Sequence, residues 1–510
     1  MKRAQEIIVV YKNGDGWHLY SSNRRKVETR SYMDWADGKI YVSIGQSFDT
    51  KRLVYDVFTI EKILDHEKSI TPESLYRKYY LKKNDKPFKV KTLISLAYGV
   101  FTRQYQEIFK RGLLECISFE AEIQGTIARI NSRLFHLNAV LFKDELDWCN
   151  AIIEKHKNVT TSRKLIIDYC KKKGYKILSG SSFYLRKPNK YKFTNIDDPI
   201  VKDYLEKSKA ISHLQFLKQF DSTSRRDYWA ADHVSVNHLC YGAINGRIYT
   251  KEPNLQALAL KYYGEDCVAF DYNAQEIMIY LHTFRPYVLD DYINSGATDF
   301  YSWLYWYVNK SFDGSPEDIR IKYPKKRKMM KDMLLQMMNG GTINGVGASI
   351  GVEGSRLKSF FNKVYSLMGF KENREKIFRY IKNTGRFLCY DGLFKKEVEN
   401  EISREYKRWS KNIQYSKGVV DKNYKRFSGD VYFKGMNYLI SSTGSLILKV
   451  AAKKIINAGF EIICLRHDEV VIVNHDKIGD VGRLMKDAYY EITGYDIGVS
   501  RKNHKVNVKS

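Results

Sequence analysis

The spacing of hydrophobic and polar positions changes several times along the chain, and each change predicts a different kind of element. Residues 1 to about 60 alternate short apolar and polar runs around the turn Asn13-Gly14-Asp15-Gly16, which predicts a small sheet followed by helices to about residue 112. From about 115 to 178, and again from Ile200 to Phe220, apolar residues recur every three or four positions, as in helices. The pattern therefore predicts a mixed fold with a separate N-terminal unit.

Three short apolar runs in the second half of the chain predict strands that end next to acidic residues. Cys267 to Phe270 reads as a buried strand, and Asp271 follows it directly. The runs 462–465 and 470–473 read as two strands around a tight turn, so His467, Asp468 and Glu469 are expected at the tip of a hairpin. Two such acids brought together can hold two Mg²⁺ roughly 3.5–4 Å apart for phosphoryl transfer. The alternative is that each acid is simply solvated.

A basic helix is predicted between these strands. It begins at Pro324, runs through Met338 and stops at Asn339-Gly340-Gly341. Four of its residues are spaced by four and share one face: Arg327, Lys331, Leu335 and Asn339. Cations at a helix start, where the helix dipole is positive, suit a triphosphate, although a solvated basic face would look the same in isolation.

Composition narrows the classes of partner. The chain has 510 residues, and its 86 Lys and Arg against 58 Asp and Glu give a formal net charge of +28. This charge is spread along the chain and predicts a polyanionic partner bound in a salt-dependent way. We find no apolar stretch of the roughly 18 to 20 residues that span a bilayer, so an intracellular protein without a membrane partner is expected. Seven cysteines without a CxxC pair argue against a disulfide framework and a structural zinc site.

Four segments in this order resemble the family A DNA polymerases. Asn245-Gly-Arg-Ile-Tyr-Thr-Lys-Glu-Pro-Asn-Leu-Gln256 is similar to TGRLSSxxPNLQ, and Asp271-Tyr-Asn-Ala-Gln-Glu276 with His282 is similar to motif A, DYSQIE and its following His. The helix from Arg327 to Gly340 is similar to motif B, RxxxKxxxFxxxYG, and His467-Asp468-Glu469 matches motif C, HDE. Gly385 to Lys395 looks like the glycine-bounded hairpin of the family. The resemblance covers about residues 115 to 510.

The resemblance implies a role for each matching residue. Asp271 and Asp468 would bind two Mg²⁺, for which Mn²⁺ can substitute, with help from the Tyr272 carbonyl, and Glu469 would be an accessory acid. Arg327 and Lys331 would hold the triphosphate, and Lys331 would protonate the leaving pyrophosphate. Glu276 would be the steric gate against a ribose 2′-hydroxyl. The expected contacts with primer and template are Arg247, Asn254, Gln256 and His467.

The departures from the family concern nucleotide selection. Leu335 stands where the family has Phe or Tyr, and Asn339 stands at the base-stacking Tyr. Tyr301 replaces the phosphate-contacting His of the DIH segment, and Ser441 replaces the usual glutamine on the DNA side. We therefore expect an active enzyme with altered fidelity or sugar discrimination.

The first 112 residues look faintly like a proofreading exonuclease. Gly45 to Asp49 and Tyr98 to Tyr105 resemble its second and third motifs, but no DxE precedes them and Thr102 stands at the expected acid. This predicts a reduced 3′-5′ exonuclease-like domain without activity, and hence synthesis without proofreading.

Together these features predict an α+β right-hand polymerase: an exonuclease-like unit at 1–112 and a polymerase domain at 113–510. Within the latter we expect a thumb at about 150–228, a palm at about 229–284 and 396–510, and fingers at about 285–395. The predicted partners are primer-template DNA and dNTPs, whereas a processivity factor is not identified. The alternatives are a single-subunit RNA polymerase and a catalytically idle nucleic-acid-binding relic. Abundant Lys, Asn, Ile and Tyr point to a phage or mobile element, and thus to a bacterial host cytoplasm.

Overall fold

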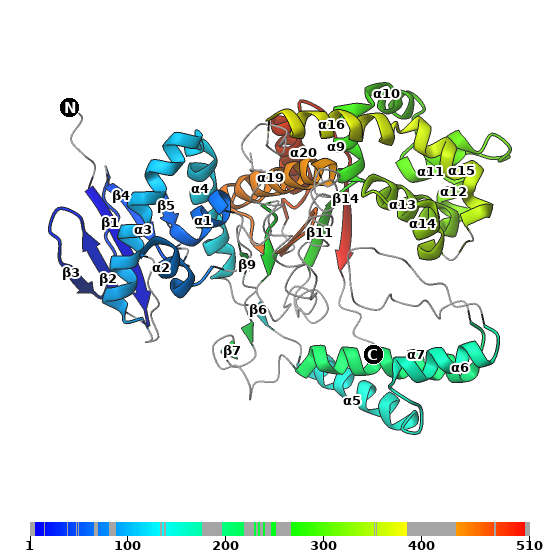
Figure 1. The fold of residues 1–510 in the computed structure, drawn as a ribbon, viewed down its shortest axis with the longest axis horizontal. Coiled ribbons are helices and arrows are strands. Elements are labelled where there is room, and N and C mark those ends of the chain that lie inside the picture. The colour runs from blue at the N-terminus through cyan, green and yellow to red at the C-terminus, as the bar shows by residue number, and fades with distance from the viewer. Residues whose placement is uncertain are drawn as a thin grey trace, which may run out of the picture.

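A computed structural model describes residues 6–504 except 15, 38, 47, 49, 51, 66–69, 81–87, 133–134, 137–138, 176–195, 219–228, 231–232, 235–237, 240–245, 251–266, 351, 353, 385–434 and 474–475. Figure 1 shows an N-terminal sheet with its helices at one end, a central sheet in the middle and a group of helices at the other end. Of the sequence predictions, Asp49, Asn254, Gln256 and the 385–395 hairpin lie outside the described residues.

The N-terminal unit is a five-stranded sheet of order β3-β2-β1-β4-β5, covered by helices. Strands β1, β2 and β3 are antiparallel neighbours, whereas β4 runs parallel to both β1 and β5. The described elements are β1 (Glu6–Asn13), β2 (Gly16–Ser21), β3 (Val27–Arg30), β4 (Lys39–Ser43), β5 (Val54–Asp56), α1 (Val57–Asp65), α2 (Pro72–Tyr80) and α3 (Val90–Arg111). A sheet followed by helices to about residue 112 is what the sequence predicted.

The central sheet has four antiparallel strands in the order β12-β13-β11-β14. These are β11 (Cys267–Tyr272), β12 (Ile462–Arg466), β13 (Glu469–Val473) and β14 (Val499–His504). Because side chains alternate along a strand, Val268, Phe270 and Tyr272 share one face, and all three are buried. The hydroxyl of Tyr272 donates to the carbonyl oxygen of Met485 over 2.7 Å, which shows that this face packs on helix α20 (Gly479–Thr493).

Helices α9 (Gln275–Phe284) and α19 (Gly435–Asn457) pack together beside the central sheet. Their close approach explains Gly444, because a Cβ atom there would meet Oε1 of Gln275 at 2.8 Å. Helix α19 also packs against α4 (Leu114–Asn131) of the N-terminal side. At this contact Nζ of Lys449 donates to Oε1 of Glu120 over 2.6 Å, and both side chains are buried. This buried ion pair links the two helices across their contact.

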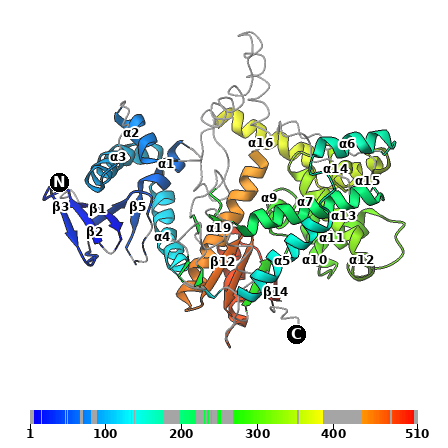
Figure 2. The same cartoon turned by 90° about the horizontal axis from the view of Figure 1, so that it is seen from below.

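Two further groups of helices complete the structure. The distal helices are α10 (Pro286–Asn294), α11 (Phe300–Val308), α12 (Pro316–Lys322), α13 (Pro324–Met338), α14 (Ile343–Ile350), α15 (Gly354–Leu367) and α16 (Phe370–Thr384). The helical arm is α5 (Ala139–Lys155), α6 (Arg163–Lys172) and α7 (Pro199–Leu217), and in Figure 1 it lies below them. Figure 2, seen from below, shows α5 and α7 in front of the distal helices.

Short strands make up two small sheets: β6 (Phe135–His136), β7 (Trp229–Ala230) and β8 (His233–Val234) in one, and β9 (His238–Leu239) and β10 (Tyr249–Thr250) in the other. The elements predicted around the acids are present: β11 covers the first run, the hairpin β12–β13 covers the other two, and α13 ends at Met338. Across the described residues, every helix is too short or too polar to cross a bilayer.

Candidate active site

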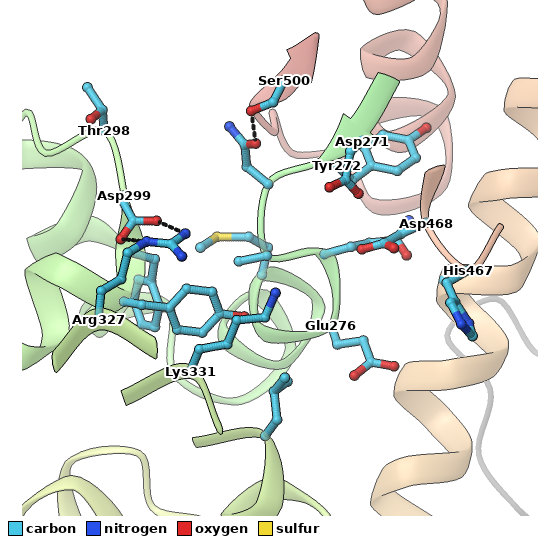
Figure 3. Close-up of a pocket in the computed structure, with 18 of the residues that line it drawn as sticks. Asp271, Tyr272, Glu276, Thr298, Asp299, Arg327, Lys331, His467, Asp468 and Ser500 are labelled. Atoms are coloured by element: carbon cyan, nitrogen blue, oxygen red, sulfur yellow. Dashed lines mark hydrogen bonds and ion pairs between the residues drawn. The ribbon is translucent and has the colours of Figure 1, made fainter. Parts of the chain in front are cut away.

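The two predicted metal-binding acids lie next to each other at one end of the central sheet. Asp271 on β11 is in register with Glu469, the first residue of β13, and Asp468 precedes Glu469 in the turn. The backbone N–H of Tyr272 donates to the carbonyl oxygen of Asp468 over 3.3 Å and ties this turn to β11. Figure 3 shows Asp271 and Asp468 at the same side of the pocket. Strand pairing thus brings together acids that are far apart in the sequence.

Near the two acids, the backbone at His467 and at Ala274 adopts left-handed conformations that are costly for non-glycine residues. His467, in the hairpin turn, has a φ of 53°, and Ala274, just before α9, has a φ of 54°. Left-handed conformations at such residues persist only where the surrounding structure holds them, and they concentrate at functional sites. Here they set the directions of Asp468 and of the first turn of α9.

A cavity of about 720 Å³ opens over these acids. Most of the predicted site residues line it: Arg247, Asp271, Tyr272, Glu276, Tyr301, Arg327, Lys331, Leu335, His467 and Asp468. Arg247 precedes β10, and the other lining residues of this set come from the central sheet, its hairpin, α9, α11 and α13 (Figure 3). Glu469, Asn339 and Ser441 are not among the lining residues. The fold therefore gathers the acids and the cationic helix around one space, whereas the roles of the individual residues stay predictions.

Carboxylates are crowded together on the acidic side of the cavity. Burial raises the pKa of the Asp468 carboxyl to about 6, and the nearby charge of Asp271 adds to the rise. Oε1 of Glu469 is buried without a hydrogen-bond partner among the described residues. Carboxylate and carbonyl oxygens are the ligands that Mg²⁺ prefers. Asp271 and Asp468 both line the cavity, and together with the backbone carbonyl oxygen of Tyr272 they offer oxygen ligands of the kind that suits a hard divalent cation.

A lysine that the sequence did not single out contacts these acids. Nζ of Lys502, on β14, donates to Oδ2 of Asp271 over 2.6 Å and lies 3.8 Å from Oε2 of Glu469. No motif points to Lys502, because its position depends on the pairing of the last strand with β11. Ser500 on the same strand hydrogen-bonds Asn273, so β14 is joined to the site at two points.

The cationic side of the cavity is built on α13, where Arg327 is held in a fixed orientation. Its Nε and Nη2 donate to the two carboxylate oxygens of Asp299 over 2.9 and 2.6 Å. Burial raises the pKa of Asp299, but the hydrogen bonds from Arg327 and Ser302 outweigh it and leave that pKa lowered. Asp299 also caps α11 by accepting from the backbone N–H of Ser302. The guanidinium predicted to bind triphosphate thus already has an anionic partner.

Tyr301 lies beneath the two cations of α13. Its ring centre is 5.6 Å from Cζ of Arg327 and 5.7 Å from Nζ of Lys331, and only 4% of the side chain is exposed. The aromatic face attracts cations at such distances. Tyr301 was predicted to contact the nucleotide. In the structure its ring also makes cation–π contacts with Arg327 and Lys331.

The residues predicted at the sugar and primer end are paired with each other. A guanidinium N–H of Arg247 donates to Oε1 of Glu276 in a short ion pair, and both side chains are partly exposed. Burial lowers the pKa of His467, and the charges of Arg247 and Arg466 lower it further. Next to the Arg247–Glu276 pair, the imidazole of His467 has a lowered pKa. This end of the cavity therefore offers both hydrogen-bond donors and hydrogen-bond acceptors.

The far end of α13 is joined to α19 by amide side chains. Nδ2 of Asn339 donates to the carbonyl oxygen of Leu335 over 2.8 Å, and Nδ2 of Asn437 donates to Oδ1 of Asn339 at short range. Ser441, predicted to face DNA, is 2% exposed, and its hydroxyl donates to Oδ1 of Asn437 over 3.4 Å. Both amides of this contact, Asn339 and Asn437, are exposed. The motif comparison did not single out Asn437, which stands four residues before Ser441.

Asp56, one of the buried acids of the N-terminal unit, has a structural role. Asp56 is 7% exposed and accepts from the backbone N–H groups of Gly45 and Thr59 over 2.6 and 3.0 Å. The hydroxyl of Thr102, at the expected exonuclease acid, donates to carbonyl oxygens of its own helix. The exonuclease resemblance stays a prediction, since Asp49 lies outside the described residues.

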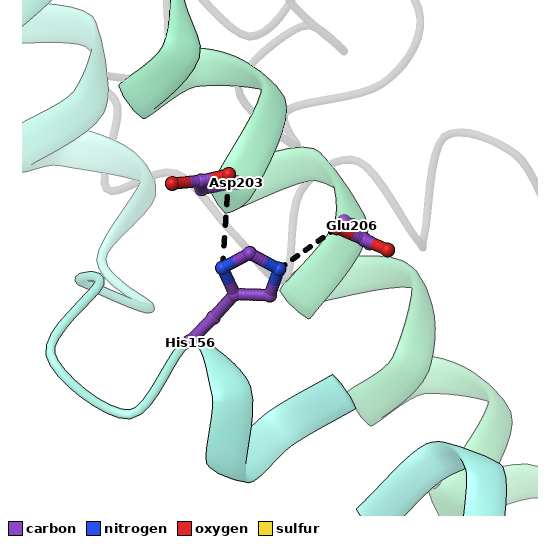
Figure 4. A group of neighbouring side chains, drawn as sticks. All are labelled: His156, Asp203 and Glu206. Atoms are coloured by element: carbon purple, nitrogen blue, oxygen red, sulfur yellow. Dashed lines mark hydrogen bonds and ion pairs between the residues drawn. The ribbon is translucent and has the colours of Figure 1, made fainter. Parts of the chain in front are cut away.

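A group of His, Asp and Glu within reach of one ion is found in the helical arm rather than at the cavity. Nε2 of His156 lies 2.8 Å from Oε2 of Glu206, and its Nδ1 lies 3.7 Å from Oδ1 of Asp203 (Figure 4). The two ring nitrogens face different carboxylates, and Lys155 also lies 3.6 Å from Glu206. This group therefore acts as an ionic link between the end of α5 and α7.

The comparison with solved structures supports the fold. The chain is similar to the polymerase domain of Pol1 from M. smegmatis, solved in complex with DNA primer-template and dNTP, with a TM-score of 0.74 and 14% sequence identity. The match covers 98% of this chain and 94% of that chain. The sequence matches no protein-family model and no curated protein. The shared architecture is thus that of a DNA polymerase domain.

Proposed function

We propose that this chain is a template-directed DNA polymerase of the family A type that adds deoxynucleotides to a primer 3′-hydroxyl. One observation carries the proposal: Asp271 and Asp468 lie at the same end of the central sheet and line one cavity with Arg327 and Lys331 of α13. Acids on one side and cations on the other are what transfer of a nucleotide from a triphosphate requires. The fold shared with a polymerase domain supports the same activity.

In the proposed reaction the primer 3′-oxygen attacks the α-phosphorus of the dNTP, a new P–O bond forms, and the bond to the β-phosphate oxygen breaks. Asp271, Asp468 and the Tyr272 carbonyl would hold two Mg²⁺, or Mn²⁺ in its place. When bound, these cations supply charge neutralisation at the attacking and leaving oxygens. Arg327 and Lys331 bind the triphosphate, and Lys331 gives a proton to the departing pyrophosphate. Glu469 supports the acid pair.

Substrate selection follows from the remaining groups. Glu276 lines the cavity and is paired with Arg247, which supports its assignment as the carboxylate that crowds a 2′-hydroxyl. Arg247, Asn254, Gln256 and His467 are assigned to primer and template. Ser441 is buried, so the contact proposed for it is assigned to Asn437, the exposed residue to which its hydroxyl donates. A net charge of +28 favours binding to the DNA backbone.

The groups of helices and the central sheet can be assigned to the subdomains of a polymerase. We propose that the distal helices form the fingers (285–395), the helical arm belongs to the thumb (150–228), and the central sheet with α9, α19 and α20 forms the palm (229–284 and 396–510). Residues 1–112 would be the exonuclease-like unit without proofreading activity. A phage or mobile-element origin, and with it a bacterial host cytoplasm, rests on composition alone.

The decisive experiment is primer extension with Asp271→Asn and Asp468→Asn. Each change should lower the extension rate by more than about 100-fold, because metal-based charge stabilisation is worth several kcal/mol. DNA affinity should stay within a few fold of the unaltered protein. Exclusive use of rNTPs would instead identify an RNA polymerase, and retention of full extension by both variants would refute the assignment of the acids.

A further inference from the structure

Lys502 is positioned on the acidic side of the cavity by the pairing of the last strand. Ser500 on β14 is opposite Asp271 on β11, and Lys502 is opposite Ala269. Because positions two apart on a strand share a face, Asp271, Ala269, Ser500 and Lys502 all lie on the same side of the sheet. Lys502 therefore has to reach back by about two residues, or roughly 7 Å, to meet the carboxylate.

The small side chains of Ala269 and Ser500 leave room for the Lys502 side chain to extend towards Asp271. Ala269, directly opposite Lys502, carries only a methyl group and is fully buried. Ser500, opposite Asp271, hydrogen-bonds Asn273 and not Asp271. The lysine stem therefore crosses the sheet over Ala269, and its ammonium group arrives between Asp271 at 2.6 Å and Glu469 at 3.8 Å.

Unlike an ordinary surface ion pair, this contact places the ammonium of Lys502 against two acids that are largely shielded from water. The Asp271 side chain is 27% exposed and that of Glu469 is 12% exposed, so the ammonium sits at the mouth of a partly desolvated acidic group. A divalent ion that takes the position of the ammonium at Oδ2 of Asp271 has to displace it, and a positive charge this close opposes a second cation on either carboxylate oxygen. The lysine and a metal ion therefore compete for the negative charge of Asp271.

We propose that Lys502 is an internal counter-cation that balances Asp271 and Glu469 in the metal-free enzyme and is displaced when a divalent ion binds. It is a positioning residue that sets the metal affinity of the site. The proposal rests on the proposed function, since it takes Asp271 as a metal ligand. In physical terms, removal of a positive charge within a few ångströms of the site strengthens cation binding and leaves the empty acids unbalanced.

The test measures Mn²⁺ binding directly, by the loss of the free-ion electron paramagnetic resonance signal, with the full chain and no nucleotide. Lys502→Met should bind Mn²⁺ at least about tenfold more tightly than the unaltered protein, and Lys502→Arg, which keeps the charge, should stay close to it. The matched control is Arg501→Met, which removes the same charge from the adjacent residue on the opposite face of β14. Its Mn²⁺ affinity should change by less than about threefold, because that charge is exposed and screened.

A second measurement protects the test from a folding artefact. In the presence of a chelator Lys502→Met should melt at a lower temperature than the unaltered protein, and saturating Mn²⁺ should close the gap. Equal Mn²⁺ affinities for Lys502→Met and the unaltered protein would overturn the proposal, as would an equal gain in Arg501→Met. Failure of Asp271→Asn to weaken Mn²⁺ binding would instead remove the proposed function, whatever Lys502 does.

Discussion

Arg327 and Asp299 form a two-point ion pair in which both carboxylate oxygens accept from the guanidinium, over 2.6 and 2.9 Å. The arginine is on the first turns of α13 and the acid is the N-cap of α11. The pair therefore joins two distal helices and also fixes the direction of a side chain assigned to the triphosphate. Bidentate Arg–carboxylate geometry is the strong form of this interaction.

Asp299→Asn should weaken nucleotide binding more than it slows chemistry. Asn still caps α11, but it cannot hold both guanidinium nitrogens, so Arg327 loses its orientation. We expect KM for dNTP to rise several-fold with a smaller change in kcat, and the free energy of unfolding to fall by about 1–3 kcal/mol. Steady-state single-nucleotide incorporation and urea unfolding measure the two effects.

The control for that variant is Asp332→Asn. Asp332 accepts from Lys328 over 2.8 Å on the same helix, and this pair is exposed, so its loss should cost only a few tenths of a kcal/mol and leave KM unchanged. An Asp299→Asn enzyme with an unaltered KM would show that the ion pair does not orient Arg327.

Asp468→Asn should abolish extension and yet stabilise the metal-free protein. The Asp468 pKa is raised from 3.8 to about 6, so above pH 6 the folded state carries a charge that folding disfavours. This cost falls as pH drops from 6 towards 3.8, because the folded state then binds the proton more readily than the unfolded state. At pH 7 in a chelator the variant should gain on the order of 1–3 kcal/mol, after allowance for solvent screening.

Chemical denaturation of Asp468→Asn and the unaltered protein at pH 7 and at pH 5 checks this prediction. The difference in stability should be larger at pH 7 than at pH 5. A variant that is less stable at both pH values would mean that Asp468 has a stabilising partner in the metal-free state.

His282 should make the protein sensitive to acid. Its two ring nitrogens are buried without partners among the described residues, its ring stacks on Tyr495 at 4.0 Å between centroids, and burial lowers its pKa from 6.5 to about 4. Between pH 6.5 and 4 the unfolded state takes up the proton first, so stability is lost as pH falls, by up to about 3 kcal/mol.

His282→Phe keeps a stacked ring and removes the titration. The free energy of unfolding of this variant should therefore fall less steeply between pH 6.5 and 4 than that of the unaltered protein, while both curves run parallel above pH 7. Equal slopes across the acid range would show that His282 titrates alike in the folded and unfolded states.

Asn339→Tyr should improve nucleotide selection. Asn339 offers hydrogen bonds to Leu335 and Asn437 where a tyrosine would offer a stacking face, and base–aromatic stacking is worth about 1–3 kcal/mol. The ratio of correct to mismatched dNTP incorporation should rise by up to about tenfold. Asn437→Ala is the control, because it breaks the amide contact without adding a ring. Unchanged selectivity in Asn339→Tyr would refute the link between this position and fidelity.

The features that depend only on neighbouring residues could be predicted from the amino-acid sequence. The apolar runs fixed β11 and the β12–β13 hairpin, and the four-residue spacing fixed the shared face of Arg327 and Lys331 on α13. These are local because strand alternation and helical period act over a few residues. With the motif order they were sufficient to predict that Asp271, Asp468 and α13 surround one site in a polymerase fold.

Which polar and charged side chains pair with one another depends on the packing of segments that are distant in the sequence. Lys502 reaches Asp271 because β14 pairs with β11, Asp299 reaches Arg327 because α11 packs on α13, and Asn437 reaches Asn339 because α19 lies beside the end of α13. Each contact joins segments whose separation in the chain carries no information about their distance in space. Side-chain pairing across such contacts depends on packing and desolvation, which a linear pattern of residue types does not encode.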